Sequence, residues 1–181
     1  MTSVARTVVD MARTESFESG VVTADHTLHS GVVDGAVLAA VLSEQETLTG
    51  NGRARSVLAF ADGLSESVGE SRSRVAMLRV GLPIPTLQRS IYTRDGRFIG
   101  RADFSYPEQR IVGEFDGRQK YHLGFTDGVQ PVEVVVAERR RSDAMERAGW
   151  IVVRWMWDDL AVPSIIARKL TAAFDLRGAR L

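Results

Sequence analysis

The chain of 181 residues is long enough for one domain with an appendage, and its 44% hydrophobic and 25% charged residues are ordinary for a globular protein. It has no apolar run of the roughly 18 residues that span a bilayer, no signal-peptide pattern and no cysteine, so we expect a cytoplasmic protein without membrane contacts, disulfides or thiolate metal sites. The net charge is zero, and any metal would need oxygen or imidazole ligands, which favours Mg²⁺ or Mn²⁺.

The first 63 residues are predicted to form a helical N-terminal region. Thr2 and Ser3 can cap a first helix, and further helices are expected over about 17–28, 34–45 and 53–61. This region carries four Arg against eight Asp or Glu, so it is acidic. No motif within it carries recognisable chemistry.

Residues 64–181 are predicted to form a mixed α/β layer. Ser67 and Glu70 match a capping box that opens a helix ending near Gly81. Strands are expected over 87–93, 97–106, 111–116 and 151–156, with a turn at 107–110 and helices over about 132–148 and 163–174. The region carries nineteen Lys or Arg against fifteen Asp or Glu. This basic excess supports DNA binding weakly, because a GC-rich genome that favours arginine codons explains it equally well.

The informative segment runs from Arg101 to Gly117. If residues 107–110 form a hairpin loop, Asp103 stands opposite Glu114 and Arg101 opposite Asp116, with all four side chains on one face of the sheet. Two opposed carboxylates repel each other, and a divalent cation would remove that cost by taking them as ligands. The alternative is a solvated polar face on which Arg101 neutralises the acids.

The loop after this hairpin holds two further candidates, Lys120 and His122. Phosphodiester hydrolysis needs a metal that activates water, and it benefits from a nearby cation that stabilises developing charge. Lys120 could supply that cation, and His122 an acid–base group or a phosphate contact. Both could equally be ordinary surface residues of a loop.

Several separated motifs occur in an order that is typical of one group of nucleases: Asp103-Phe…Pro107-Glu…Arg110…Val112…Glu114-x-Asp116-Gly117…His122, then Glu138-x-x-Arg141-x-Asp143…Gly149-Trp150-x-Val152-Val153-Arg154. Over about residues 65–160 the chain resembles very-short-patch-repair-like endonucleases. More closely, it resembles their actinobacterial relatives in the restriction-endonuclease-like PD-(D/E)XK superfamily. The resemblance implies a mixed sheet flanked by helices over residues 64–181, following the helical region 1–63.

The resemblance also implies metal ligands at Glu70, Asp103 and Glu114. The chain departs from the superfamily pattern at Asp116, where a lysine is expected, so Lys120 would have to act from a shifted position. The His on which the mismatch-repair enzymes rely is similar to His122, whereas their zinc site has no counterpart. On the residues alone, Glu70 completing its capping box is the better interpretation.

Arg101, Arg118, Arg139 and Arg141 are the candidates for DNA contacts, since arginine suits phosphate recognition. For the two on the helix over 132–148, the alternative is an exposed face with charge pairs between neighbouring turns.

The leading hypothesis is a Mg²⁺- or Mn²⁺-dependent DNA endonuclease in DNA repair or phage defence. The alternative is a catalytically inactive nuclease-fold module that binds DNA or regulates a defence or toxin–antitoxin system. A third interpretation is that the acidic residues 1–63 shield the basic region from DNA. The expected partners are DNA, a second copy of the chain as a homodimer, and a winged-helix domain; in longer relatives such a domain lies upstream, so the chain is expected to be a stand-alone short form or a truncated one.

Overall fold

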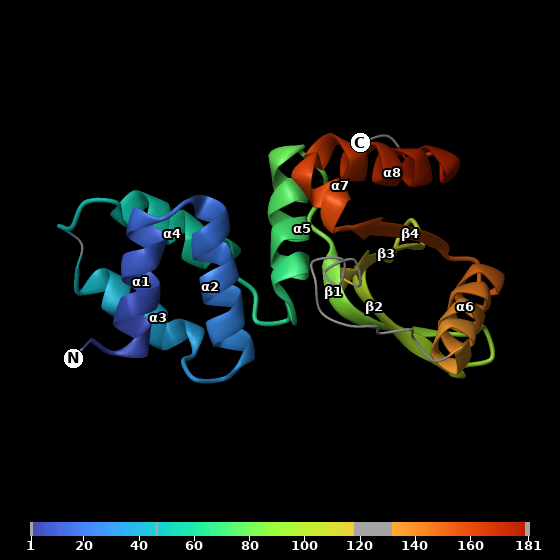
Figure 1. Cartoon of the computed structure of the whole chain (residues 1–181), viewed down its shortest axis with the longest axis horizontal. Coiled ribbons are helices and arrows are strands. Elements are labelled where there is room, and N and C mark those ends of the chain that lie inside the picture. The colour runs from blue at the N-terminus through green and yellow to red at the C-terminus, as the bar shows by residue number, and fades with distance from the viewer. Residues whose placement is uncertain (1, 46, 118–131, 180–181) are drawn as a thin grey trace. The chain divides into compact units, whose positions relative to one another are not determined.

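The computed structural model describes residues 2–45, 47–117 and 132–179 (Figure 1). Contacts divide the chain into two compact units, Met1–Val75 and Ala76–Leu181. The division falls inside helix α5 (Val68–Arg79), whereas the sequence suggested a boundary after residue 63. None of the helices in the described residues combines the length and apolarity needed to cross a bilayer.

The first unit consists of short helices packed around a small apolar core. Its helices are α1 (Val4–Thr14), α2 (Phe17–His29), α3 (Gly35–Ser43) and α4 (Asn51–Phe60), followed by the first part of α5. Ser3, Ser16 and Asp34 accept hydrogen bonds from backbone N–H groups in the first turns of α1, α2 and α3, as expected of N-cap residues. The helical character predicted for this region is therefore confirmed.

A buried ion pair joins α5 to the other helices of the first unit. Arg74 Nη1 lies 2.8 Å from Asp25 Oδ2, and both side chains are almost fully buried. The other oxygen of Asp25 accepts a hydrogen bond from the backbone N–H of Asp62, at 2.8 Å. The Arg74 guanidinium also stacks 4.5 Å from the centre of the Phe60 ring and donates to the Phe60 carbonyl. These contacts explain why the first unit extends past residue 63 to Val75.

The second unit is built on a sheet whose four strands, among the described residues, have the order β1-β2-β3-β4. The strands are β1 (Thr86–Tyr92), β2 (Phe98–Tyr106), β3 (Ile111–Asp116) and β4 (Ile151–Met156). The first two pairings are antiparallel and the third, between β3 and β4, is parallel. This confirms the predicted mixed sheet flanked by helices.

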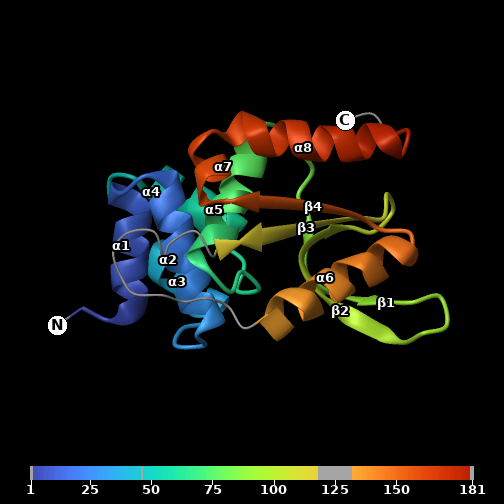
Figure 2. The same cartoon turned by 45° about the vertical axis from the view of Figure 1, so that its right-hand side comes forward.

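Helices cover both faces of this sheet (Figures 1 and 2). On one face, α8 (Pro163–Leu176) packs against a core that includes Phe104, Tyr106, Trp155 and Leu170. On the other face, α6 (Val132–Arg147) packs against β2 and β4 over a smaller cluster: Ile91, Ala102, Val112 and Met145. The short helix α7 (Trp157–Ala161) follows β4 directly and was not predicted, because five residues are too few to show a helical period.

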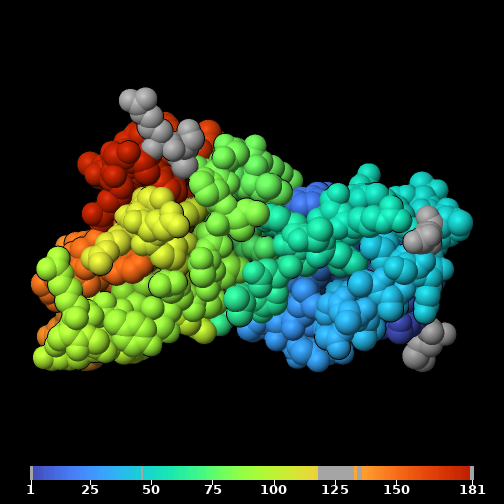
Figure 3. Space-filling model, turned by 180° about the vertical axis from the view of Figure 1, so that it is seen from behind, coloured from blue at the N-terminus to red at the C-terminus, as the bar shows by residue number. Residues whose placement is uncertain are grey.

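The hairpin between β2 and β3 has the predicted register. Tyr106 pairs with Ile111 across a four-residue loop, and the ladder continues to Phe104 opposite Gly113. Arg110, the last loop residue, has a positive φ of 52°, which lets the chain turn back into β3. In the space-filling view, the yellow atoms of this loop lie at the surface between the red atoms of α8 and the yellow-green atoms of β1 and β2 (Figure 3).

Candidate functional site

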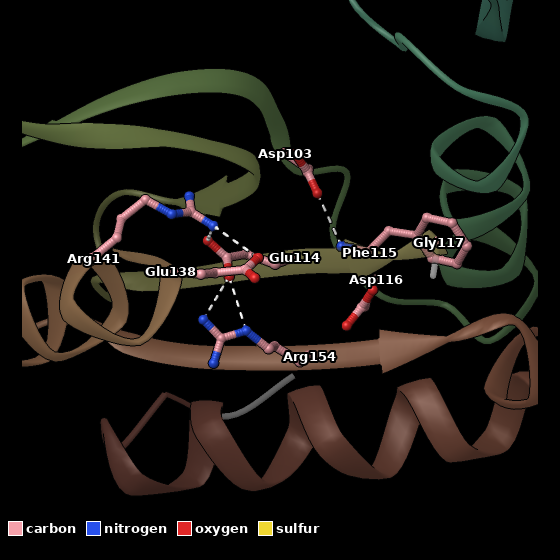
Figure 4. A pocket seen from close by; sticks show the side chains of 8 residues that line it. All are labelled: Asp103, Glu114, Phe115, Asp116, Gly117, Glu138, Arg141 and Arg154. Atoms are coloured by element: carbon pink, nitrogen blue, oxygen red, sulfur yellow. Dashed lines mark hydrogen bonds and ion pairs between the residues drawn. The ribbon is translucent and has the colours of Figure 1, made fainter. Parts of the chain in front are cut away.

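A polar pocket of about 330 Å³ lies where β3 and β4 end and α6 crosses the sheet (Figure 4). We call it the acid pocket. Its described lining residues are four carboxylates, two arginines and a short apolar edge: Asp103, Glu114, Asp116, Glu138, Arg141, Arg154, Phe115 and Gly117.

The parallel pairing of β3 with β4 places Glu114 beside Arg154, its ladder neighbour. Arg154 Nη2 lies 2.8 Å and Nε 3.0 Å from the same Glu114 oxygen, Oε2. The Glu114 residue is 6% exposed, so this charge pair is largely shielded from water on the Glu114 side. Gly113, the preceding residue, lies under the Trp155 ring, which would overlap any side chain there. The backbone of β3 can therefore approach Trp155 closely, and this packing fixes the position of Glu114.

The second cation on Glu114 comes from α6. Arg141 Nη2 lies 2.9 Å from Glu114 Oε1, although the angles at that buried oxygen do not meet those of a hydrogen bond. Arg141 reaches the acid across Gly100, where the Cβ of any larger residue would lie 2.8 Å from the Arg141 Cδ. Its Nη1 donates to the Arg101 carbonyl at 3.1 Å. Glu114 is thus held between two guanidinium groups from two different elements.

Asp103 sits where the β2–β3 ladder stops. Instead of a further backbone pair, the Asp103 carboxylate Oδ2 accepts a hydrogen bond from the Phe115 N–H at 2.9 Å. Beyond this point the chain is fixed by α7, because Trp157 packs edge-on against Phe115 and donates from Nε1 to the Gly117 carbonyl at 3.1 Å. The hydrogen bond from the Phe115 N–H fixes the orientation of the Asp103 carboxylate at the pocket and also holds the backbone of Phe115 in place.

Four of the predicted site residues come together in the acid pocket: Asp103, Glu114, Asp116 and Arg141. Arg101 is exposed on β2, opposite Ser90 of β1. Arg139 is exposed on α6 and forms an ion pair of 3.2 Å with Asp143, one turn along the helix. Arg139 thus makes the charge pair between helical turns that the alternative interpretation expected. Arg141, by contrast, reaches off the helix to Glu114.

Glu70 belongs to the first unit and takes part in the N-terminal cap of α5, where its N–H donates to the Ser67 hydroxyl oxygen at 3.2 Å. Its carboxylate accepts hydrogen bonds from the Ser67 hydroxyl at 2.8 Å and from the Glu66 N–H at 3.0 Å. Its role as a metal ligand stays a prediction. Arg118, Lys120 and His122 lie outside the described residues.

Two pocket residues, Glu138 and Arg154, were not assigned to the site from sequence. Arg154 had a visible signal, since it is the one charged residue in the apolar strand Ile151–Met156. Glu138 lies three residues before Arg141 on α6, the spacing that puts both on one helix face, and the two side chains approach to 3.9 Å.

The acid pocket offers carboxylate oxygens but no tight cluster of ligands. In the described part of the chain, no three His, Cys, Asp or Glu side chains are grouped closely enough to hold a metal ion among them. A metal ion bound in this pocket would therefore have one or two carboxylate ligands, and water or another ligand would have to complete its coordination.

Comparison with known proteins gives relatives of unknown activity. No protein-family model matches the chain, and no solved structure matches it significantly. The chain is 30% identical over 175 residues to the uncharacterized protein MT2308 of Mycobacterium tuberculosis (strain CDC 1551 / Oshkosh) and to the uncharacterized protein Rv2248 of strain ATCC 25618 / H37Rv. The alignment covers 96% of this chain and 61% of each relative, so the chain spans about three fifths of the length of the curated relatives it matches.

Proposed function

We propose that the second unit is a restriction-endonuclease-like domain that hydrolyses phosphodiester bonds in DNA with the help of Mg²⁺ or Mn²⁺. The observation that carries the proposal is the charge of the acid pocket. Its described lining has four carboxylates against two guanidinium groups, a formal charge of −2. A phosphodiester is itself an anion, and a divalent cation bound by carboxylates of this lining would attract it.

The residues present fit such a cation. Carboxylate oxygens are hard ligands of the kind Mg²⁺ and Mn²⁺ prefer, and the chain contains no cysteine to favour softer metals. Asp103 and Glu114 would hold the ion, with Asp116 on the same pocket wall. When bound, it would polarise the phosphate and lower the pKa of an attacking water.

The chain's own contribution is orientation and charge. The Phe115 N–H fixes the Asp103 carboxylate, so this ligand needs little reorganisation on metal binding. Arg141 and Arg154 hold Glu114 in place, and their planar guanidinium groups also match phosphate oxygens. A phosphate of the DNA can therefore replace Glu114 as the anion bound by these two arginines, and the Glu114 carboxylate is then free to bind the cation. That exchange would couple DNA binding to assembly of the metal site.

A second candidate function is a non-catalytic DNA-binding or regulatory module with the same fold. The observation that favours it is the pair of arginines on Glu114, which neutralises that carboxylate without any metal. Such a module would bind DNA with strong salt dependence and no metal requirement.

Cleavage of supercoiled plasmid in EDTA, Mg²⁺ and Mn²⁺ tests the proposal. The variant is Asp103→Asn, because its amide oxygen can still accept the Phe115 N–H while the charge that binds metal is lost. The matched control is Glu108→Gln in the exposed hairpin loop. We expect metal-dependent nicking or linearisation by the wild type and by the control, and a loss of at least 100-fold in Asp103→Asn. Equal cleavage by both variants would place the chemistry elsewhere. No cleavage by the folded wild type in any metal would favour the non-catalytic module.

A further inference from the structure

A second groove, lined by arginines, lies at the C-terminal end of α6. One part, of about 210 Å³, is lined mainly by β1 and the turn after it, with residues from the hairpin loop and the end of α6: Arg89, Ser90, Ile91, Tyr92, Thr93, Arg94, Arg110, Ala148 and Trp150. A neighbouring hollow of about 290 Å³ shares Thr93, Arg94 and Ala148 with it and adds Ala144 and Arg147. The shared residues form a common wall of the two hollows, and we call the two together the basic groove.

Within the described part of the chain, the charges of the basic groove are not paired with carboxylates. Among the described residues that line it there are four arginines and no Asp or Glu. None of Arg89, Arg94, Arg110 and Arg147 forms an ion pair with a carboxylate of the described residues. Nearby arginines behave differently: Arg97, for example, lies 2.8 Å from Asp95. Four clustered cations without counter-charges attract an anion that carries several charges at short spacing.

Aromatic side chains accompany these arginines. Tyr92 lines the groove and is 52% exposed, and the edge of its ring meets Phe98, which is 61% exposed, at a centroid distance of 5.7 Å. Trp150 forms part of the same wall. Exposed aromatic rings beside arginines are the combination that binds nucleic acid strands, because bases stack on the rings while the arginines contact phosphates.

We propose that the basic groove binds the phosphodiester backbone of DNA and holds the strand that enters the acid pocket. The inference rests on the proposed function and names where its substrate is held. Helix α6 leads from one site to the other. Arg141 of this helix lines the acid pocket, and Ala148, directly after its last residue, lines the basic groove. Seven residues at 1.5 Å each separate them by roughly 10 Å along the helix axis. That distance corresponds to about three nucleotides of a strand in duplex DNA, at 3.4 Å each.

The test measures DNA binding by the full chain in EDTA, where metal-dependent cleavage cannot occur. The variant Arg94→Gln/Arg147→Gln removes two groove charges whose side chains make no hydrogen bond or ion pair among the described residues. The control variant Arg140→Gln/Arg168→Gln removes two exposed charges that line neither site. Fluorescence anisotropy with a labelled duplex, from 50 to 300 mM NaCl, gives affinity and salt slope for each.

Two lost phosphate contacts should reduce the slope of log K against log[salt] by about 1.8, and the affinity at 0.15 M salt by roughly 30-fold. The control should bind like the wild type. Equal losses in both variants would mean that net charge alone drives binding, and a groove variant that binds like the wild type would place the DNA elsewhere. Either result overturns the proposal, as does a folded wild type that binds no DNA.

Two further variants distinguish DNA binding in the basic groove from general polyanion binding and from binding at the acid pocket. Tyr92→Leu should weaken binding to DNA but leave binding to heparin unchanged, because heparin has charge and no bases; equal effects on both would mean a general polyanion site and overturn the assignment to DNA. Asp103→Asn should bind DNA in EDTA at least as tightly as the wild type. If the groove variant loses affinity while no protein cleaves DNA in any metal, the groove stands and the catalytic proposal fails.

Discussion

Gly113 gives the sharpest test of how the fold positions the acid pocket. Replacing it with alanine adds one methyl group between β3 and the ring of Trp155. That Cβ would overlap Cη2 of Trp155 and lie 2.8 Å from its Cζ3, whereas carbon atoms normally approach to about 3.5–4.0 Å. Trp155 is 1% exposed and its neighbour Phe104 is fully buried, so both rings are enclosed by other atoms of the core.

Overpacking of this kind costs about 1–3 kcal/mol. For a unit of the size of Ala76–Leu181, each kcal/mol lowers the melting temperature by roughly 4–8 °C, so Gly113→Ala should lower the Tm of this unit by about 5–20 °C. Differential scanning calorimetry measures the shift, and near-ultraviolet circular dichroism follows the environment of the Trp155 ring.

The matched control is Gly117→Ala, where the nearest atom to the new Cβ would be at an ordinary 3.5 Å. It should change the Tm by less than about 3 °C. Adding Trp155→Phe to Gly113→Ala removes the clashing ring atoms, so the double variant should be more stable than the sum of the two single changes predicts. A Gly113→Ala protein that melts with the wild type would refute the close packing of β3 on Trp155.

Three further predictions follow from buried or paired charges and from a buried hydroxyl. Arg154→Gln removes one cation from Glu114, so Mn²⁺ affinity measured by calorimetry should rise by about two- to fivefold. The Arg154 side chain is 40% exposed, so water screens its attraction to Glu114 to roughly 1 kcal/mol. Unchanged affinity would mean that Glu114 does not bind the metal. Asp25→Asn leaves Arg74 buried without its counter-charge and should cost about 3–5 kcal/mol in urea unfolding, and a cost below about 1 kcal/mol would contradict the buried pair. Burial raises the pKa of the Tyr106 hydroxyl above its ordinary value of 10.0. Above about pH 10 the unfolded chain therefore releases this proton while the folded chain keeps it, and stability should fall by up to about 1.4 kcal/mol per pH unit, a slope that Tyr106→Phe should reduce in melts between pH 10 and 11.

Local sequence signals predicted most of this fold because they act over a few residues. Cap residues such as Ser3 and Asp34 mark helix starts by bonding to the next turn, which is visible in the sequence as a spacing. The β2–β3 register followed from one assumption, a four-residue loop, since a hairpin fixes all its pairs once the loop length is known. The sequence alone therefore predicted that Asp103, Glu114 and Asp116 lie near one another.

The parts that sequence did not supply depend on contacts between distant segments. Glu114 meets Arg154 because β4 joins β3 in parallel after α6, and no local pattern specifies which strand a later one will pair with. The boundary after Val75 likewise depends on the pairing of Asp25 with Arg74, which are far apart in the chain. The sequence does contain indications of such long-range contacts: a charged residue in an apolar strand, such as Arg154, and a glycine within a strand, such as Gly113.

The two sites on α6 have opposite charges, and this separates what each can do. The basic groove can attract DNA without a metal, because its four arginines have no counter-charges among the described residues. The described lining of the acid pocket has four carboxylates against two guanidinium groups, so it favours a divalent cation as the ligand that brings the phosphate into the pocket. Salt should therefore act mainly on affinity and divalent metal mainly on cleavage. If cleavage at saturating DNA did not need a divalent metal, or if DNA affinity in EDTA did not depend on salt, the two sites would not have these separate roles.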